Sequence, residues 1–89
     1  MELEINNIVK IRKGGFGVVT AFNKKPCVIV FEGFVSPINR YNSDLKHKNS
    51  NYDIVEVYEG KKVENYKEVY RKSFDPSKLK LIYKESYGN

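Results

Sequence analysis

The 89-residue chain contains no tryptophan, one methionine, one histidine and one cysteine. A disulfide framework needs cysteines in pairs, so Cys27 cannot form one within this chain. A structural zinc site needs four Cys or His ligands, and Cys27 and His47 are too few. No apolar run approaches the ~20 residues of a membrane-spanning helix. We therefore predict no disulfide scaffold, no metal, no cofactor and no contact with a membrane.

A signal peptide is also not expected. The first residues, Met1 to Glu4, are acidic and lack the order of basic and then apolar residues that such a signal needs, so we predict a cytoplasmic location. A chain of this length folds as one domain, residues 1–89 with a core at about 8–84, and buries only ~60–65% of its surface. A second lobe and a deep cavity are not expected.

Composition and charge describe a folded, basic protein. The apolar fraction is 40% and the charged fraction is 30%, as in globular proteins. Lys and Arg number 16 against 11 Asp and Glu, which gives a net charge of +5. This charge favours an anionic partner, such as a nucleotide, a nucleic acid or an acidic protein.

Short β-branched or alternating segments predict a chain of strands. We expect strands at 8–12, 17–22, 27–31, 34–38, 53–58 and 78–84. Gly14 and Gly15 predict a hairpin turn, because glycine readily adopts positive φ. Residues 63–72 carry apolar side chains on one helical stripe and predict one or two turns of helix, with Glu68 pairing with Lys72.

Alternation within the strands predicts which side chains face the core. In the first strand, Val9 and Ile11 share one face and Ile8 lies on the other. In the strand at 53–58, Val55 and Val57 are expected on one face, with Ile54 and Tyr58 on the other. In the last strand, inward side chains are expected at Leu79, Leu81 and Tyr83, and outward ones at Lys78, Lys80 and Lys84.

The fold class predicted from these elements is mainly β. We expect a small SH3-like barrel, or a rolled antiparallel sheet, of five to six strands with one short helix. The stretch from Tyr41 to Tyr58 organises it, because a long polar loop there leads into a strong strand. Leu45 is the one clearly apolar residue of the loop at 39–51 and is expected to hold it against the core.

Two motifs carry a family resemblance. The patterns Tyr-Asn-x-Asp-Leu at 41–45 and Asp-Ile-Val-x-Val-Tyr at 53–58 follow an apolar strand and precede Leu-Ile-Tyr at 81–83. In this arrangement the chain resembles small proteins of bacteriophages and prophages of Gram-positive bacteria, over about residues 8–84. The resemblance implies a phage origin, a bacterial host and an SH3-like fold. It implies no activity and no site residues.

Catalytic chemistry is poorly represented. A Cys27–His47 pair could in principle act as nucleophile and base. However, Cys27 begins an apolar strand, where it is expected to be a buried apolar residue, and His47 lies between two lysines in a polar loop. The glycine turn precedes a strand, whereas a phosphate-binding loop precedes a helix. We therefore predict that the protein is not an enzyme.

The best functional signal is the set of basic and aromatic residues at the first turn and in the long loop. Guanidinium groups bind phosphate with two donors, and tyrosine rings stack on bases. Asn42 and Asp44 are expected mainly to shape the loop. The predicted ligand-binding residues are Arg12, Lys13, Arg40, Tyr41, Asn42, Asp44, Lys46, Lys48 and Tyr52.

Two functions fit these features. In the first, the protein is a phage accessory protein that counters host defence by sequestering a nucleotide-type anionic signal or by blocking a host defence protein. In the second, it is a small β-barrel that binds nucleic acid through the same side chains. A small barrel offers little concavity, so a homo-oligomer with a ligand between its subunits is expected.

Overall fold

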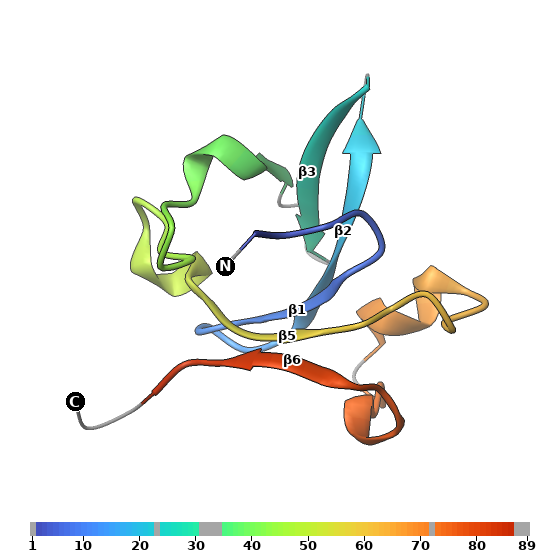
Figure 1. Ribbon diagram of the computed structural model, residues 1–89. Helices are drawn as coiled ribbons and strands as arrows, with labels where there is room; N and C mark the ends of the chain where they lie inside the picture. The colour runs from blue at the N-terminus through green and yellow to red at the C-terminus, as the bar shows by residue number, and fades with distance from the viewer. Residues whose placement is uncertain (1, 23, 31–34, 72, 87–89) are drawn as a thin grey trace.

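The computed structural model describes residues 2–22, 24–30, 35–71 and 73–86, apart from the side chains of 22 and 26–30. Its strands are β1 (Ile8–Ile11), β2 (Phe16–Phe22), β3 (Lys25–Val30), β4 (Val35–Pro37), β5 (Ile54–Tyr58) and β6 (Leu81–Lys84). They form one antiparallel sheet in the order β4-β3-β2-β1-β5-β6 (Figure 1). The predicted small, mainly β fold is confirmed. The SH3-like barrel stays a prediction.

β1 lies inside the sheet between β2 and β5, and side chains from both of its faces are buried. Ile8 and Val9 are fully buried, and Ile11 is 1% exposed. Successive side chains of a strand point to opposite faces, so Val9 and Ile11 enter one hydrophobic cluster and Ile8 enters another. The predicted facing of β1 is confirmed. The turn that follows it has Gly14 and Gly15 at positive φ, as predicted.

The first cluster is closed by residues 38–53, here called the loop cover. This segment contains two short 3-10 helices, η1 (Ile38–Arg40) and η2 (Ser50–Tyr52). Tyr41 and Leu45 from the loop cover pack with Val9 and Ile11 from β1. Leu45 is 2% exposed, so its predicted role in holding the loop against the core is confirmed.

The second cluster is closed by residues 63–79, here called the C-terminal cover. It contains the 3-10 helices η3 (Tyr66–Tyr70) and η4 (Pro76–Lys78). Val69 of η3 is 1% exposed and packs with Ile8. In Figure 1 the two covers, green to yellow and orange, lie on different sides of the central strands. The sheet therefore separates the loop cover from the C-terminal cover.

The helix predicted within 63–72 is present but is of the 3-10 type, and the described residues contain no α-helix. The Asn65 side chain accepts a hydrogen bond from the Lys67 backbone N–H at 3.1 Å, which caps the start of η3. Poor hydrogen-bond geometry generally keeps 3-10 helices short. The predicted pair of Glu68 with Lys72 lies outside the described residues.

A β-bulge changes which face Ile54 occupies. Lys10 of β1 pairs with Glu56, whereas the next residue, Ile11, pairs with Ile54. Val55 is thus an extra residue in β5, and an extra residue reverses the alternation of side chains. Ile54 consequently packs in the same cluster as Val57. The prediction that Ile54 and Val57 face opposite ways was wrong for this reason.

A second irregularity lies in β6. Val57 pairs with Tyr83 and Tyr58 pairs with Leu81, which leaves Ile82 as the extra residue. The strand begins at Leu81 rather than near residue 78, because the chain first forms η4. Leu81 was predicted to face inward, but it is 46% exposed, and the neighbouring Ile82 is 44% exposed. Two consecutive exposed apolar residues result.

The ends of the sheet are β4 and β6. β4 is a short edge strand that ends at Pro37, within the segment 34–38 where a strand was predicted. The predictions for residues 31–34, and that of a buried Cys27 side chain, lie outside the described residues. Within the described ranges, the chain has no helix with the length and apolar character needed to span a bilayer.

Gly60 lies in the turn after β5, where the backbone of another segment approaches it closely. A Cβ at this position would lie 2.0 Å from the Asn6 carbonyl oxygen and 2.9 Å from Cγ1 of Ile8. We therefore expect Gly60→Ala to lower the free energy of unfolding by about 3 kcal/mol, measured by urea denaturation. Gly14→Ala is the control, because no atom lies within 4 Å of its Cβ and only its positive φ opposes the change. Its expected cost is about 1–2 kcal/mol. Equal costs would contradict the role given to the close approach at Gly60.

Candidate functional site

The first turn and the loop cover bring Lys13 and Tyr52 together. The Lys13 backbone N–H donates to the Asn51 carbonyl at 2.9 Å, which joins the end of β1 to η2. The Lys13 ammonium then lies 5.6 Å from the centre of the Tyr52 ring, within cation–π range. Both residues were predicted to bind a ligand. In the structure they contact each other.

Arg12 is held in an ion-pair network. Its guanidinium donates to Asp53 at 3.2 and 3.3 Å and to Glu85 at 2.6 Å. The side chain of Asp53 is 7% exposed and also accepts the His47 backbone N–H at 2.8 Å. The hydrogen bond to Glu85 is the main reason that the pKa of Arg12 is raised. Arg12 therefore ties β1 to the loop cover and the C-terminal segment, although it was predicted to bind phosphate.

Tyr41 belongs to the core. It is 8% exposed, its hydroxyl donates to the Tyr52 carbonyl at 2.9 Å, and its ring meets that of His47 edge-on at 5.1 Å. Burial raises the pKa of the Tyr41 hydroxyl above its ordinary value. A buried ring has no free face on which a base could stack. Tyr41 therefore packs the loop cover against the core and does not bind a ligand through its ring.

The other predicted residues follow the exposed outside of the loop cover. The Asn42 side chain accepts the backbone N–H groups of Asp44 at 2.9 Å and of Lys46 at 3.1 Å, which shapes the turn. Asp44 and the basic residues Arg40, Lys46 and Lys48 are exposed. The structure thus places these cations on one loop, while the hollows described below are lined by other residues.

His47 also builds the loop. Its Nδ1 accepts the Asn49 backbone N–H at 3.0 Å, and its Nε2 lies 3.2 Å from the Ser36 hydroxyl of β4. Because Nδ1 accepts this hydrogen bond, Nε2 is the ring nitrogen left to donate toward the Ser36 hydroxyl. Among the described residues, no three His, Cys, Asp or Glu side chains gather in a way that could hold a metal ion.

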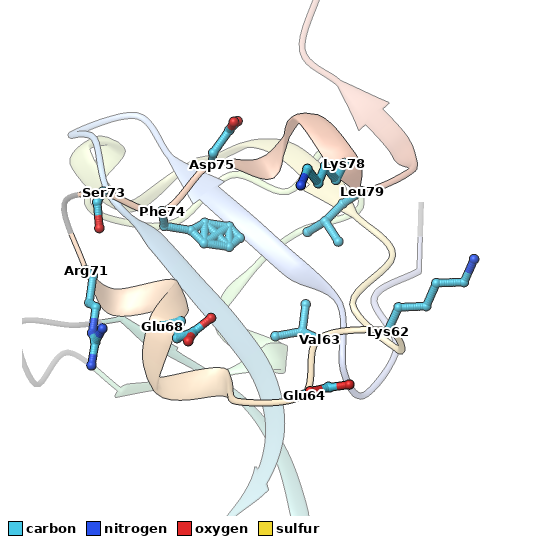
Figure 2. Close-up of a pocket in the computed structure, with 10 residues that line it drawn as sticks. All are labelled: Lys62, Val63, Glu64, Glu68, Arg71, Ser73, Phe74, Asp75, Lys78 and Leu79. Carbon is cyan, nitrogen blue, oxygen red and sulfur yellow. The ribbon is translucent and has the colours of Figure 1, made fainter.

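A hollow of about 490 Å³ lies at the C-terminal cover, on the side of the sheet that holds the second hydrophobic cluster (Figure 2). None of the residues that were predicted to bind a ligand lines it. Its apolar lining is Val63, Phe74 and Leu79, which also pack against the second hydrophobic cluster. Figure 2 shows these three side chains facing one another across its middle. Polar and charged side chains surround them, namely Lys62, Glu64, Glu68, Arg71, Ser73, Asp75 and Lys78.

A smaller hollow of about 180 Å³ adjoins the first and shares Lys62, Lys78 and Leu79 with it. Glu59 and Lys80 complete its lining. Three lysines therefore face one carboxylate here, whereas the larger hollow has three cations and three carboxylates at its rim. Positive charge gathers at the Lys62–Lys78–Lys80 end, and the carboxylates Glu64 and Glu68 lie on the η3 side. We call the two hollows together the C-terminal pocket.

Asp75 shapes the rim of the C-terminal pocket. Its side chain accepts the Ser77 backbone N–H at 2.9 Å and so caps η4, which carries Lys78. That hydrogen bond is the main reason that the pKa of Asp75 is lowered, and the nearby charge of Lys78 lowers it further. Capping by Asp75 therefore holds Lys78 and Leu79 where they line the pocket.

Sequence reasoning did not find the C-terminal pocket. Its lining residues were assigned to the helix at 63–72, to the strand at 78–84 and to the segments beside them. Two of its lysines, Lys78 and Lys80, were expected on the outer face of that strand. The signal that could have found it is Phe74, a large aromatic residue between the polar residues Ser73 and Asp75 and close to Pro76. Aromatic side chains bury a large apolar area, so a phenyl ring in a polar segment usually packs against an apolar surface.

Comparisons of the chain with protein-family models, with curated proteins and with solved structures give no match. The candidate site is therefore defined by its geometry alone.

The network around Asp53 predicts a loss of stability when this side chain is removed. Asp53→Ala leaves Arg12 with Glu85 alone and leaves the His47 N–H without its acceptor. We expect the free energy of unfolding to fall by about 2 kcal/mol, measured by urea denaturation. Asp44→Ala is the matched control, because Asp44 is exposed in the same loop and its expected effect is within about 0.5 kcal/mol. Similar effects of the two changes would show that the network does not stabilise the fold.

The cap at Asp75 predicts a pH dependence. A carboxyl with a lowered pKa in the folded state stabilises the fold above its ordinary pKa of 3.8, and this stabilisation is lost as the pH falls through the lowered value. Asp75→Ala should therefore melt below the wild type at pH 7, and the difference should shrink as the solution is acidified below pH 3.8. Thermal melts at a series of pH values measure this. A difference that stays constant down to the lowest pH would contradict the cap.

Proposed function

We propose that this protein binds a small anionic ligand with a flat apolar group, of the nucleotide type, in the C-terminal pocket. The observation that supports this most is that a hollow with an apolar floor adjoins a hollow lined by three lysines, and that the two share Lys62, Lys78 and Leu79. Volumes of about 300–1,000 Å³ are usual for sites that bind small molecules. The pocket volume falls within this range.

The arrangement suits the two halves of a nucleotide. An aromatic base can stack on Phe74 between Val63 and Leu79. Its N–H groups can donate to Glu64 or Glu68, because ionised carboxylates accept strong hydrogen bonds. The phosphate then reaches Lys62, Lys78 and Lys80, where ammonium groups supply charge and donors. The rim carries both carboxylates and lysines. It therefore suits a ligand that has hydrogen-bond donors as well as negative charge better than it suits a fatty acid, which has no such donors.

The biological setting that we propose follows the family resemblance. A phage protein of this kind would act inside the bacterial host by sequestering a nucleotide signal of a defence system. The C-terminal pocket is formed by one chain, so binding there does not require a second copy. The homo-oligomer stays a prediction, although the lack of concavity that motivated it does not apply to this pocket.

Nucleic acid is the second candidate ligand, and the exposed cations Arg40, Lys46 and Lys48 of the loop cover favour it. Burial of Tyr41 removes one of the two rings expected to stack on bases. A strand of nucleic acid would then be held mainly through its phosphates, and such binding falls steeply with salt. The small-ligand proposal relies on the other side of the sheet, so salt dependence and mutation separate the two.

Isothermal titration of the full chain with a panel of mononucleotides and cyclic nucleotides tests the proposal. We expect at least one to bind, and we expect Lys62→Glu to weaken its affinity about ten-fold by losing a charge-assisted hydrogen bond. The neighbouring Lys61→Glu is the matched control, because Lys61 is exposed and does not line the pocket. It changes the net charge equally and should leave the affinity nearly unchanged.

Two results would contradict the proposal. The first is no heat with any nucleotide of the panel at millimolar concentration. The second is an equal loss of affinity in Lys61→Glu and Lys62→Glu, which would mean that general surface charge attracts the nucleotide. Titration of labelled protein by NMR gives an independent check, because ring-current shifts should appear at Phe74 and Leu79 first.

A further inference from the structure

β6 forms an open edge of the sheet and carries exposed apolar side chains on it. Among the described strands it pairs only with β5. Leu81 is 46% exposed and Ile82 is 44% exposed, although consecutive residues of a strand usually point to opposite faces. The irregular pairing at Ile82 leaves both uncovered. A further strand added at this edge would cover apolar surface as well as pair the free backbone groups.

Positive charge accompanies this edge. Lys78, Lys80 and Lys84 are all exposed, and no Asp or Glu occurs between residues 78 and 84. The carboxylate that follows, Glu85, is engaged by Arg12 at 2.6 Å. The edge therefore offers lysines and apolar side chains to an incoming strand.

A second copy of this chain fits the edge poorly. A two-fold antiparallel pairing centred on Ile82 would bring Lys80 and Lys84 of both copies into one short strand pair, with no Asp or Glu between residues 78 and 84 to offset their charge. Like charges brought this close repel one another and weaken such a pair. The other edge of the sheet, β4, has three residues and ends in Pro37, which has no N–H to donate. A second β6 would therefore bring like charges together, and a second β4 would be too short and would lack an N–H donor at Pro37.

We propose that β6 docks an extended acidic segment of a partner protein, which adds a seventh strand to the six-stranded sheet. Acidic side chains of that segment would meet Lys80 and Lys84, and apolar ones would cover Leu81 and Ile82. Backbone hydrogen bonds supply affinity in such strand addition, and the alternating side chains supply specificity. This surface shares Lys80 with the rim of the C-terminal pocket but uses none of the apolar floor, and it gives the chain a second, protein-binding function.

The probe is an eight-residue peptide of alternating Glu and Val with blocked ends, titrated into the ¹⁵N-labelled full chain. We expect amide shifts concentrated at residues 80–84, and no such shifts with the corresponding Lys and Val peptide. Ile82→Glu should weaken binding about ten-fold, because it removes an apolar contact and adds a like charge. Val35→Glu is the matched control, since Val35 is 48% exposed on the opposite edge, and it should bind the peptide like the wild type.

Three outcomes would overturn the proposal. One is a set of shifts spread over all lysine-bearing surfaces rather than β6. Another is equal affinity of Ile82→Glu and Val35→Glu for the acidic peptide. The third is a dimer in sedimentation experiments that Ile82→Glu dissociates, because a second copy would then cover the edge. Ile82 is already exposed, so its replacement is not expected to unfold the chain, and the amide spectrum of the variant is the check on its fold.

Discussion

Burial of both faces of β1 is the constraint on which the rest of the structure depends. Ile8 points to one side and Val9 and Ile11 to the other, and all three are almost entirely removed from water. Each face of so small a sheet needs a cover, because exposed apolar side chains would lose the free energy that burial supplies. The loop cover and the C-terminal cover meet this need with little regular structure of their own. Each cover is a short segment that must follow the surface of the sheet, and it therefore contains turns and 3-10 helices instead of long regular elements.

Polar interactions fix the loop cover, and they involve several residues that the sequence marked as functional. Asp53 is buried, and it accepts from Arg12 and from the His47 backbone. A buried carboxylate is costly unless donors satisfy it, so the chain engages Arg12 there. Net charge alone could not show this, because counting cations says nothing about which carboxylate each cation meets. The residues predicted to form a basic site therefore include some, such as Arg12, that hold the loop cover in place.

Local patterns predicted what depends on local geometry. Alternation placed Ile8, Val9 and Ile11 correctly, and one leucine in a polar loop identified the anchor of the loop cover. Patterns failed at Ile54 and Leu81, because a bulge is set by the register between two strands and reverses the side chains beyond it. The C-terminal pocket was missed for a related reason. Its lining comes from turns, from the two 3-10 helices η3 and η4 and from the residues just before β6. Only the packing of the C-terminal cover brings these segments together.

The place of the pocket follows from the size of the domain. The core of so small a sheet has no room for an enclosed cavity. A concave site therefore forms at the boundary between the sheet and its cover. The floor residues Val63, Phe74 and Leu79 consequently pack against the core and line the pocket at the same time. A ligand seated there would contact the side chains that hold the C-terminal cover to the sheet. Binding only to the folded chain would then stabilise the cover together with the fold, so ligand occupancy and the stability of this part of the molecule are thermodynamically linked.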